Sequence, residues 1–312
     1  MAVDASLSVV IATYNRAHTL SRAVRSVLDQ TYKDFEIVVV DDGSKDRTAE
    51  VVASFNDTRI KYIKHDRNRG VSAARNTGIN ATTSKYVAFQ DSDDVWLPEK
   101  LDKQMAIFKE APPSVGVVYT GFLKIAGGSV AYVPGPSLTK KDGRIYDSLI
   151  CRGNYVTPQA AVVRRECFEK AGLFDENIRC FEDWELWLRI SECYEFKCVD
   201  QPLVIVYGGT EDSLLGNLDA AAEGLELITK KHWRNIRDKD RRLLASYYIS
   251  VANNFRSMGQ FRRARNYYVK AAAAYPFDVR CVGAALAASL GDRAFDALAR
   301  IYHTTRRRFA RA

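Results

Sequence analysis

The chain of 312 residues is 47% apolar, which is enough to bury one large domain together with a smaller one. Charged residues make up 27%, which excludes a chain that is disordered by composition. The net charge of +8 is uneven, because residues 213–312 carry +11 and residues 1–212 carry −3.

The cysteines and the apolar segments exclude further classes of protein. The six cysteines include no C-x-x-C pair, which argues against a zinc finger, and a secreted disulfide framework is not expected in so long a chain. The longest nearly uncharged apolar run, at 281–290, is too short to span a bilayer. No basic and apolar leader precedes the first predicted strand. These features predict a cytoplasmic protein, with peripheral attachment to the inner face of a membrane as an option.

In the first 114 residues, apolar runs that predict strands alternate with helically spaced apolar residues. Strands are predicted at 7–12, 35–40, 60–63 and 86–89, and helices at 20–28, 48–55, 71–81 and from Pro98 onward. This alternation indicates βαβ units and an α/β fold with a mostly parallel sheet. Ligands bind such sheets at the carboxyl ends of the strands, where acidic clusters follow the second and fourth strands.

The rest of the chain predicts an acceptor half and a helical extension. Strands are expected at 115–125, 158–163 and 196–206, and a helix at 182–193. From 213 to 312 the pattern is helical, and 247–276 has the small-residue spacing of a single tetratricopeptide unit, interpreted as one helical hairpin. The predicted domains are therefore 1–212, with a nucleotide-binding half of about 1–114 and an acceptor half of about 115–212, and a basic helical region at 213–312.

Asp91-Ser92-Asp93 follows the fourth predicted strand and is a candidate metal site. A nucleoside diphosphate does not sit beside bare carboxylates, and a divalent cation that binds hard oxygens resolves the repulsion. Spacing of i, i+2 on an extended segment places both carboxylates on one side of the loop. The alternative is an acidic turn before the helix that begins near Pro98.

Asp41-Asp42 ends the second predicted strand. A carboxylate there can accept hydrogen bonds from a ribose hydroxyl or a base N–H, and the alternative is a turn, since D-G-S-x-D is good turn chemistry. The sequence has no G-x-G-x-x-G after the first strand and no G-x-x-x-x-G-K-[ST], which argues against a dinucleotide oxidoreductase and a P-loop NTPase.

Two helix starts complete the set of candidates. The first follows Gly70, where small residues allow a close approach to the sheet and Arg75 either contacts the base or diphosphate or is a surface residue. The second begins at Glu182, where a carboxylate is either a helix cap or a general base for the acceptor hydroxyl. Trp184 either stacks on a sugar or packs in the core.

Five motifs, in this order, resemble the family 2 glycosyltransferases over roughly residues 5–210. They are Ser8–Arg16 (SVVIATYNR), Asp41–Ser44 (DDGS), Asn68–Asn76 (NRGVSAARN), Asp91–Asp94 (DSDD) and Glu182–Trp184 (EDW). The resemblance implies the GT-A fold and an inverting transfer from a nucleotide-diphosphate sugar. Ala12 stands where many members have proline, and Tyr207-Gly208-Gly209-Thr210 replaces an Arg-containing motif.

The resemblance also implies roles for individual residues. Substrate-binding roles are expected for nine positions, namely Thr13, Tyr14, Asn15, Asp41, Asp42, Arg75, Asp91, Glu182 and Trp184. Within this set, Thr13, Tyr14 and Asp42 would hold the nucleoside. Asp93 is the expected metal ligand, with Asp91 and Asp94 beside it, and the cofactor would be Mn²⁺ or Mg²⁺. Asp183 resembles the catalytic base.

The expected partners follow from this resemblance and from the charge of the C-terminal third. A nucleotide-diphosphate sugar, with a UDP-sugar favoured, would be the donor, and a saccharide or lipid-linked sugar the acceptor. Residues 300–312 contain five arginines and no acid, which predicts either a basic helix on an anionic membrane or a solvated tail. Nucleic acid is not an expected partner. The alternative functions are an inactive glycosyltransferase-like adaptor and a sugar nucleotidyltransferase.

Overall fold

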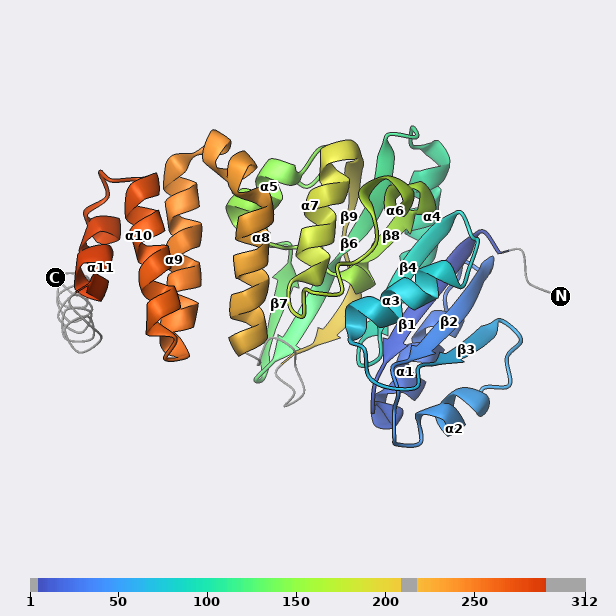
Figure 1. Cartoon of the computed structure of the whole chain (residues 1–312). Helices are drawn as coiled ribbons and strands as arrows, with labels where there is room; N and C mark the ends of the chain where they lie inside the picture. Colours follow the sequence, from blue (N-terminus) through green and yellow to red (C-terminus); the bar gives the residue numbers. More distant parts are fainter. Residues whose placement is uncertain (1–4, 209–217, 290–312) are drawn as a thin grey trace. The chain divides into compact units, whose positions relative to one another are not determined.

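The computed structural model describes residues 5–208 and 218–289, and the chain divides into two compact units, 1–213 and 214–312. Each unit is described by itself. In the first unit, a sheet of nine strands is flanked by helices (Figure 1). The predicted α/β architecture with a helical C-terminal part is confirmed.

The sheet consists of a parallel half that continues into a mixed half. The strands are β1 (Leu7–Thr13), β2 (Phe35–Asp41), β3 (Ile60–Lys64), β4 (Tyr86–Asp91), β5 (Val95–Trp96), β6 (Val115–Ala126), β7 (Ser129–Val133), β8 (Ala161–Arg164) and β9 (Glu195–Tyr207). Their order is β3-β2-β1-β4-β8-β6-β9-β5, with β7 paired to β6. Strands β3, β2, β1 and β4 are parallel, and β8 runs antiparallel between β4 and β6.

The strands form where the sequence offers continuous β-branched runs. All seven residues of β1 except Ala12 are buried, as expected for a strand covered on both faces. The helices of this unit are α1 (Ala17–Leu28), α2 (Thr48–Ala53), α3 (Val71–Asn80), α4 (Lys100–Glu110), α5 (Tyr146–Arg152), α6 (Arg165–Ala171) and α7 (Glu182–Cys193), with a 3₁₀ turn, η1, at Pro158–Ala160.

Helices cover both faces of the parallel half. Val9 and Ile37 pack with Leu20 of α1 in the main core, whereas Val38 pairs with Ala74 of α3 on the opposite face. Helix α3 approaches the sheet closely, because a Cβ added at Gly78 would lie 2.3 Å from Cγ1 of Val10. The small residues of α3 therefore set the spacing between helix and sheet.

The short elements of the mixed half differ from the sequence prediction. The strand expected at 158–163 begins as the 3₁₀ turn η1 and becomes β8 only at Ala161, because Pro158 lacks the N–H that a ladder requires. Strands β5 and β7 were not predicted. They contain two and five residues, which is too short for a periodic pattern to be read.

The second unit is helical over its described residues. Its helices are α8 (Leu218–Lys239), α9 (Arg241–Ser257), α10 (Phe261–Ala274) and α11 (Val279–Ser289). Asp240 caps α9 by accepting the N–H of Arg242 at 2.7 Å, and Gly259, with φ of 71°, permits the turn into α10. Among the described helices, none combines the length and apolar character needed to cross a membrane. The basic segment 300–312 lies outside the described residues.

Candidate functional site

The carboxyl ends of three adjacent strands bring the candidate residues together. Thr13 at the end of β1 is in register with Asp41 of β2, and Ala12 is in register with Asp91 of β4. The loops that follow these strands therefore lie on one edge of the sheet, where open α/β sheets bind ligands.

The loop after β1 presents one buried and one exposed candidate. Thr13 is 3% exposed, and its Oγ1 has no hydrogen-bond partner within the described part of the chain. The neighbouring Tyr14 is 41% exposed. Asn15 has φ of 51°, and it joins this loop to the next one by donating its N–H to Ser44 Oγ at 2.8 Å and accepting the N–H of Lys45 at 2.9 Å. Asn15 thus shapes the loop.

Asp41 braces the loop after β2 from inside the protein. Its Oδ1 accepts the N–H of Ser44 at 2.7 Å, and its Oδ2 accepts the hydroxyl of Tyr62 at 2.5 Å. The residue is 0% exposed. No surface of its carboxylate is open in this structure, so the role that the contacts support for Asp41 is that of a brace, and its ligand contact stays a prediction.

Asp42 holds the segment that leads into α3. Its carboxylate accepts the N–H groups of Arg69 (2.9 Å) and Gly70 (2.7 Å), and Nδ1 of His65 lies 2.7 Å from Oδ1. Nε2 of His65 in turn lies 2.9 Å from the hydroxyl of Thr77. Asp42 therefore connects the end of β2 to α3 through the segment 65–70.

The glycine after Asp42 is required by this connection. Gly43 has φ of 83°, and a Cβ at this position would lie 2.7 Å from the backbone carbon of Arg67. Only glycine combines the left-handed conformation with this close approach. The DDG sequence thus packs the loop after β2 against the loop that precedes α3.

Arg75 on α3 bridges two carboxylates from distant parts of the chain. Its Nη1 donates to Glu182 of α7 at 2.7 Å, and its Nη2 donates to Asp91 at 2.9 Å. Burial lowers the pKa of Arg75, but the two carboxylates outweigh burial and the net pKa is raised. The guanidinium is buried between Asp91 and Glu182, and its contact with the base or diphosphate stays a prediction.

Asp93 and Asp94 follow Asp91 but have different surroundings. Burial and the Asp91 charge raise the pKa of Asp93, which lies 3.8 Å from Arg16. Asp94 is 2% exposed, and its two oxygens accept the backbone N–H of Tyr207 (3.0 Å) and the amide of Gln159 (2.7 Å). Asp94 therefore anchors the loop to β9 and η1, and its metal contact stays a prediction.

Asp91 and Asp93 have the character of ligands for a hard cation. Over the described ranges, no three His, Cys, Asp or Glu side chains cluster closely enough to hold a metal ion by themselves. Mg²⁺ typically takes only one or two carboxylates and completes its shell with substrate phosphates and water. The side chains of Asp91 and Asp93 are 30% and 24% exposed, and the charge of Asp91 contributes to the raised pKa of Asp93. This donor set fits a divalent cation that is shared with a diphosphate.

Asp183, at the beginning of α7, is partly exposed. Its Oδ1 accepts the N–H of Trp184 at 2.7 Å, and its Oδ2 accepts the amide of Asn154 at 2.8 Å. Burial and then the charge of Glu182 raise the pKa of Asp183 to about 7, against the lowering effect of Arg75 and of both hydrogen bonds. A carboxylate with a pKa near neutrality is suited to general-base chemistry.

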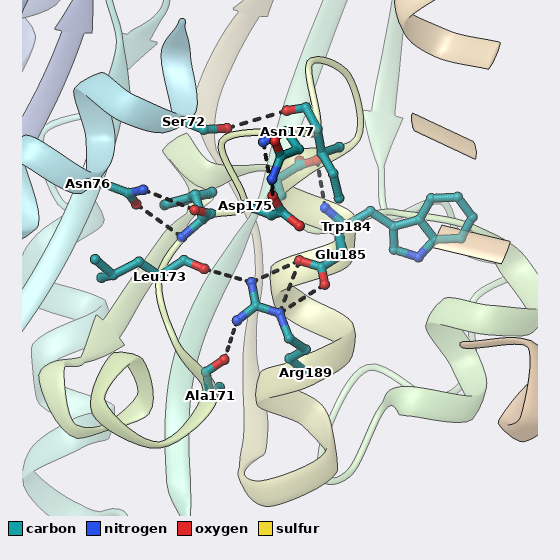
Figure 2. Close-up of polar contacts among 12 residues, drawn as sticks. Ser72, Asn76, Ala171, Leu173, Asp175, Asn177, Trp184, Glu185 and Arg189 are labelled. Carbon is teal, nitrogen blue, oxygen red and sulfur yellow. Dashed lines mark hydrogen bonds and ion pairs between the residues drawn. The ribbon is translucent and has the colours of Figure 1, made fainter. Parts of the chain in front are cut away.

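The segment that precedes α7 is fixed by α3 and by α7 itself. Asn76 donates to the carbonyl of Phe174 at 2.9 Å and accepts its N–H at 3.0 Å. Figure 2 shows Arg189 between Glu185 and the carbonyls of Ala171 and Leu173, all of which it contacts. The helix start that carries Asp183 is therefore anchored on both sides.

Trp184 packs largely inside the protein. The residue is 7% exposed, and its ring packs edge-on against Phe181 with centroids 6.1 Å apart. These contacts favour the core interpretation of Trp184, and stacking on a sugar stays a prediction.

Three further residues of the site carried no sequence signal. His65 and Gln159 hold Asp42 and Asp94, and Asn154 contacts Asp183. Each lies in an irregular segment and meets its partner 23 to 65 residues away in the sequence. No periodicity or local motif marks such contacts.

Together, the open α/β sheet with acidic strand ends and the mixed β8-β6-β9 half define the GT-A architecture of nucleotide-sugar-dependent glycosyltransferases. The chain belongs to glycosyl transferase family 2, whose sequence model matches residues 8–172. An uncharacterized glycosyltransferase of Rickettsia conorii is 35% identical over 210 residues, which cover 66% of this chain and 34% of that protein. The chain thus spans about a third of the length of the first curated relatives it matches.

Two further proteins are similar over different extents. Escherichia coli WfgD, a UDP-Glc:α-D-GlcNAc-diphosphoundecaprenol β-1,3-glucosyltransferase, is 39% identical over 104 residues, covering 33% of this chain and 41% of WfgD. The crystal structure of Staphylococcus aureus TarS 1–349 in complex with UDP superposes with a TM-score of 0.66 at 20% identity, covering 86% of this chain and 81% of that chain. At this identity the structural similarity concerns the fold.

Proposed function

We propose that this glycosyltransferase moves a sugar from a nucleotide-diphosphate donor to an acceptor hydroxyl, with Asp183 as the general base. The observation that carries the proposal is the link from Asp183 to the strand-end acids. Its neighbour Glu182 binds Arg75, and Arg75 binds Asp91 at the end of β4. A partly exposed carboxylate with a pKa of about 7 therefore belongs to the same polar network as the candidate diphosphate site.

The reaction is a single displacement with inversion at the anomeric carbon. The acceptor oxygen forms a bond to that carbon while the bond from carbon to the diphosphate oxygen breaks, and the acceptor proton passes to Asp183. The nucleoside is assigned to the loop after β1, with Thr13 and Tyr14, and to the region of Asp42. The unpartnered Oγ1 of Thr13 supports this placement, since a buried hydroxyl without a partner is costly.

A divalent cation, Mn²⁺ or Mg²⁺, would be held by Asp91 and Asp93. When bound, it would supply positive charge to the departing diphosphate. Asp94 is assigned the task of fixing the loop that carries these two ligands. A UDP-sugar is the favoured donor, which the UDP complex of the TarS structure supports.

The experiment that tests this function measures release of nucleoside diphosphate. The protein is incubated with UDP-glucose or UDP-GlcNAc and Mn²⁺, with water in place of the acceptor. We expect slow release of UDP that requires Mn²⁺, and Asp183→Asn should lower it by about 100-fold or more, the usual contribution of a general base. Binding of UDP should persist in this variant. UDP binding without any turnover in the wild-type protein would indicate an adaptor instead of an enzyme.

The acceptor is proposed to be a lipid-linked sugar, as it is for WfgD, whose name gives GlcNAc-diphosphoundecaprenol as its acceptor. The arginines of 300–312 support this assignment, because basic residues near an anionic bilayer each contribute about 1 kcal/mol to attachment. The test compares the full chain with a 1–290 truncation in pelleting with vesicles containing anionic lipid. Equal pelleting of the two proteins would remove the membrane part of the proposal.

A further inference from the structure

Asn154 lies beside the proposed base, but nothing in its sequence context connects it with α7. Helix α5 ends at Arg152, and Gly153, with φ of 83°, turns the chain so that Asn154 follows directly. Its Nδ2 donates to Asp183 Oδ2 at 2.8 Å. The two residues are 29 positions apart in the sequence, so the contact is a product of the fold.

The orientation of the Asn154 amide is fixed by its two partners. Its Oδ1 accepts the N–H of Val156 at 3.1 Å, and that backbone group is only a donor. An ionised Asp183 is only an acceptor. The amide therefore has one arrangement that satisfies both contacts, with oxygen toward Val156 and nitrogen toward Asp183.

The same segment is also tied to the helix that carries Asp183. The indole Nε1 of Trp187, one helical turn after Asp183, donates to the carbonyl of Val156 at 2.6 Å. Trp187 is 0% exposed, so this attachment is rigid. Three hydrogen bonds thus run from Asp183 through Asn154 and Val156 to Trp187. The backbone of α7, which carries both Asp183 and Trp187, closes the ring.

We propose that Asn154 is a positioning residue that holds the Asp183 carboxylate in one orientation for proton transfer from the acceptor. With the Trp184 N–H on Oδ1 and Asn154 on Oδ2, rotation of the carboxylate is restricted. Each carboxylate oxygen accepts more than one hydrogen bond, so acceptor capacity remains for the incoming hydroxyl. The inference rests on the proposed function, because it assigns a role relative to the base.

The charges around Asp183 support this role. Burial and the charge of Glu182 on α7 disfavour its ionised form, and Arg75 on α3 favours it, with Asp91 on the far side of that guanidinium. The nearby Cys180 stays a neutral thiol, because burial and the charges of Glu182 and Asp183 raise its pKa to about 12. The Asn154 amide is a neutral donor that also favours the ionised form. Removing it should therefore raise the pKa of Asp183 further and leave the carboxylate free to turn.

The test uses Asn154→Ala and Asn154→Asp, with Asn177→Ala as the matched control. Asn177 is an exposed asparagine in the loop before α7, where its side chain donates to Asp175 (Figure 2). Asn154→Asp keeps the size of the side chain and an oxygen for Val156, but replaces the donor with a second acid. The measurements are Mn²⁺-dependent UDP release from UDP-GlcNAc between pH 5.5 and 9, UDP affinity, and thermal unfolding.

We expect Asn154→Ala to lower kcat by roughly tenfold or more, the scale of one hydrogen bond to a charged group, and Asn154→Asp to lower it further. In both variants the acid limb of the pH–rate profile should move to higher pH, while UDP affinity and the control variant stay unchanged. If Asn154→Asp folds and retains the wild-type kcat and acid limb while Asp183→Asn is inactive, the positioning role is refuted and the proposed function stands. If Asp183→Asn is active, the base assignment itself is refuted.

Discussion

The acids at the donor edge of the sheet and the acid at the start of α7 are the same residue type in opposite situations. Asp41 and Asp42 end β2 and are surrounded by N–H and hydroxyl donors that satisfy their charge. Asp183 has two donors, yet burial and Glu182 raise its pKa to about 7. The difference shows that an aspartate is a structural brace where donors saturate it, and a candidate for proton transfer where they do not.

The largest expected effect comes from removing the guanidinium of Arg75, which joins the two regions. Arg75→Met leaves the carboxylates of Asp91 and Glu182 buried or half-buried without their partner. Breaking one side of a buried ion pair costs about 3–5 kcal/mol, so the free energy of unfolding should fall by that order. Urea unfolding at pH 7.5 measures this change. The double variant Arg75→Met/Glu182→Gln should recover part of it, and no recovery would contradict the pairing.

The second prediction is that replacing aspartate with asparagine changes the stability of the protein in opposite directions in the two regions. Asp41→Asn faces the N–H of Ser44 and the hydroxyl of Tyr62 with an amide that has only one acceptor, and should destabilise the protein by about 1–3 kcal/mol. Asp183→Asn should instead stabilise it above pH 7. A carboxyl whose folded pKa lies above its unfolded value of 3.8 gives stability at low pH that is lost as pH rises through about 7.

Thermal unfolding of the wild type and both variants between pH 4.5 and 8.5 checks these signs. The difference in Tm between Asp183→Asn and the wild type should be smallest at the acid end and should grow as pH rises through about 7. A constant difference at all pH values would mean that the pKa of Asp183 is not raised by folding.

The third prediction concerns rate. If Asp183 must be ionised to accept a proton, kcat for UDP release should rise about tenfold per pH unit below pH 7 and level off above it. The measurement is a pH–rate profile at saturating donor and Mn²⁺. A flat profile between pH 5.5 and 7 would assign proton transfer to a different group.

Sequence reasoning predicted the fold better than it predicted individual contacts. Local sequence patterns indicate the alternation of strands and helices and the position of acids at strand ends. Each such pattern is contained within two strands and the helix between them. The partners of the two adjacent acids do not follow from a local pattern. Asp41 contacts Tyr62 of β3, and Asp42 contacts His65, which directly follows β3. The sequence cannot show that register before the sheet is formed.

The protein partners of Arg75 and Asp94 were not predicted from the sequence. Each residue was expected to meet a ligand, and the structure pairs Arg75 with Glu182 and Asp94 with Gln159. These partners are 107 and 65 residues away in the sequence. Long-range pairs of this kind are set by how the acceptor half packs on the sheet, and no local pattern encodes them.

The tight seating of α3 against β1 has a consequence for engineering this protein. Gly78, which touches Val10, stands one helical turn after Arg75 on the same helix. A methyl group added there would have to displace α3 or Val10, and a displaced α3 would disturb the contacts of Arg75 with both of its carboxylates. Gly78→Ala should therefore lower both the free energy of unfolding and turnover, and a smaller residue at position 10 should restore both.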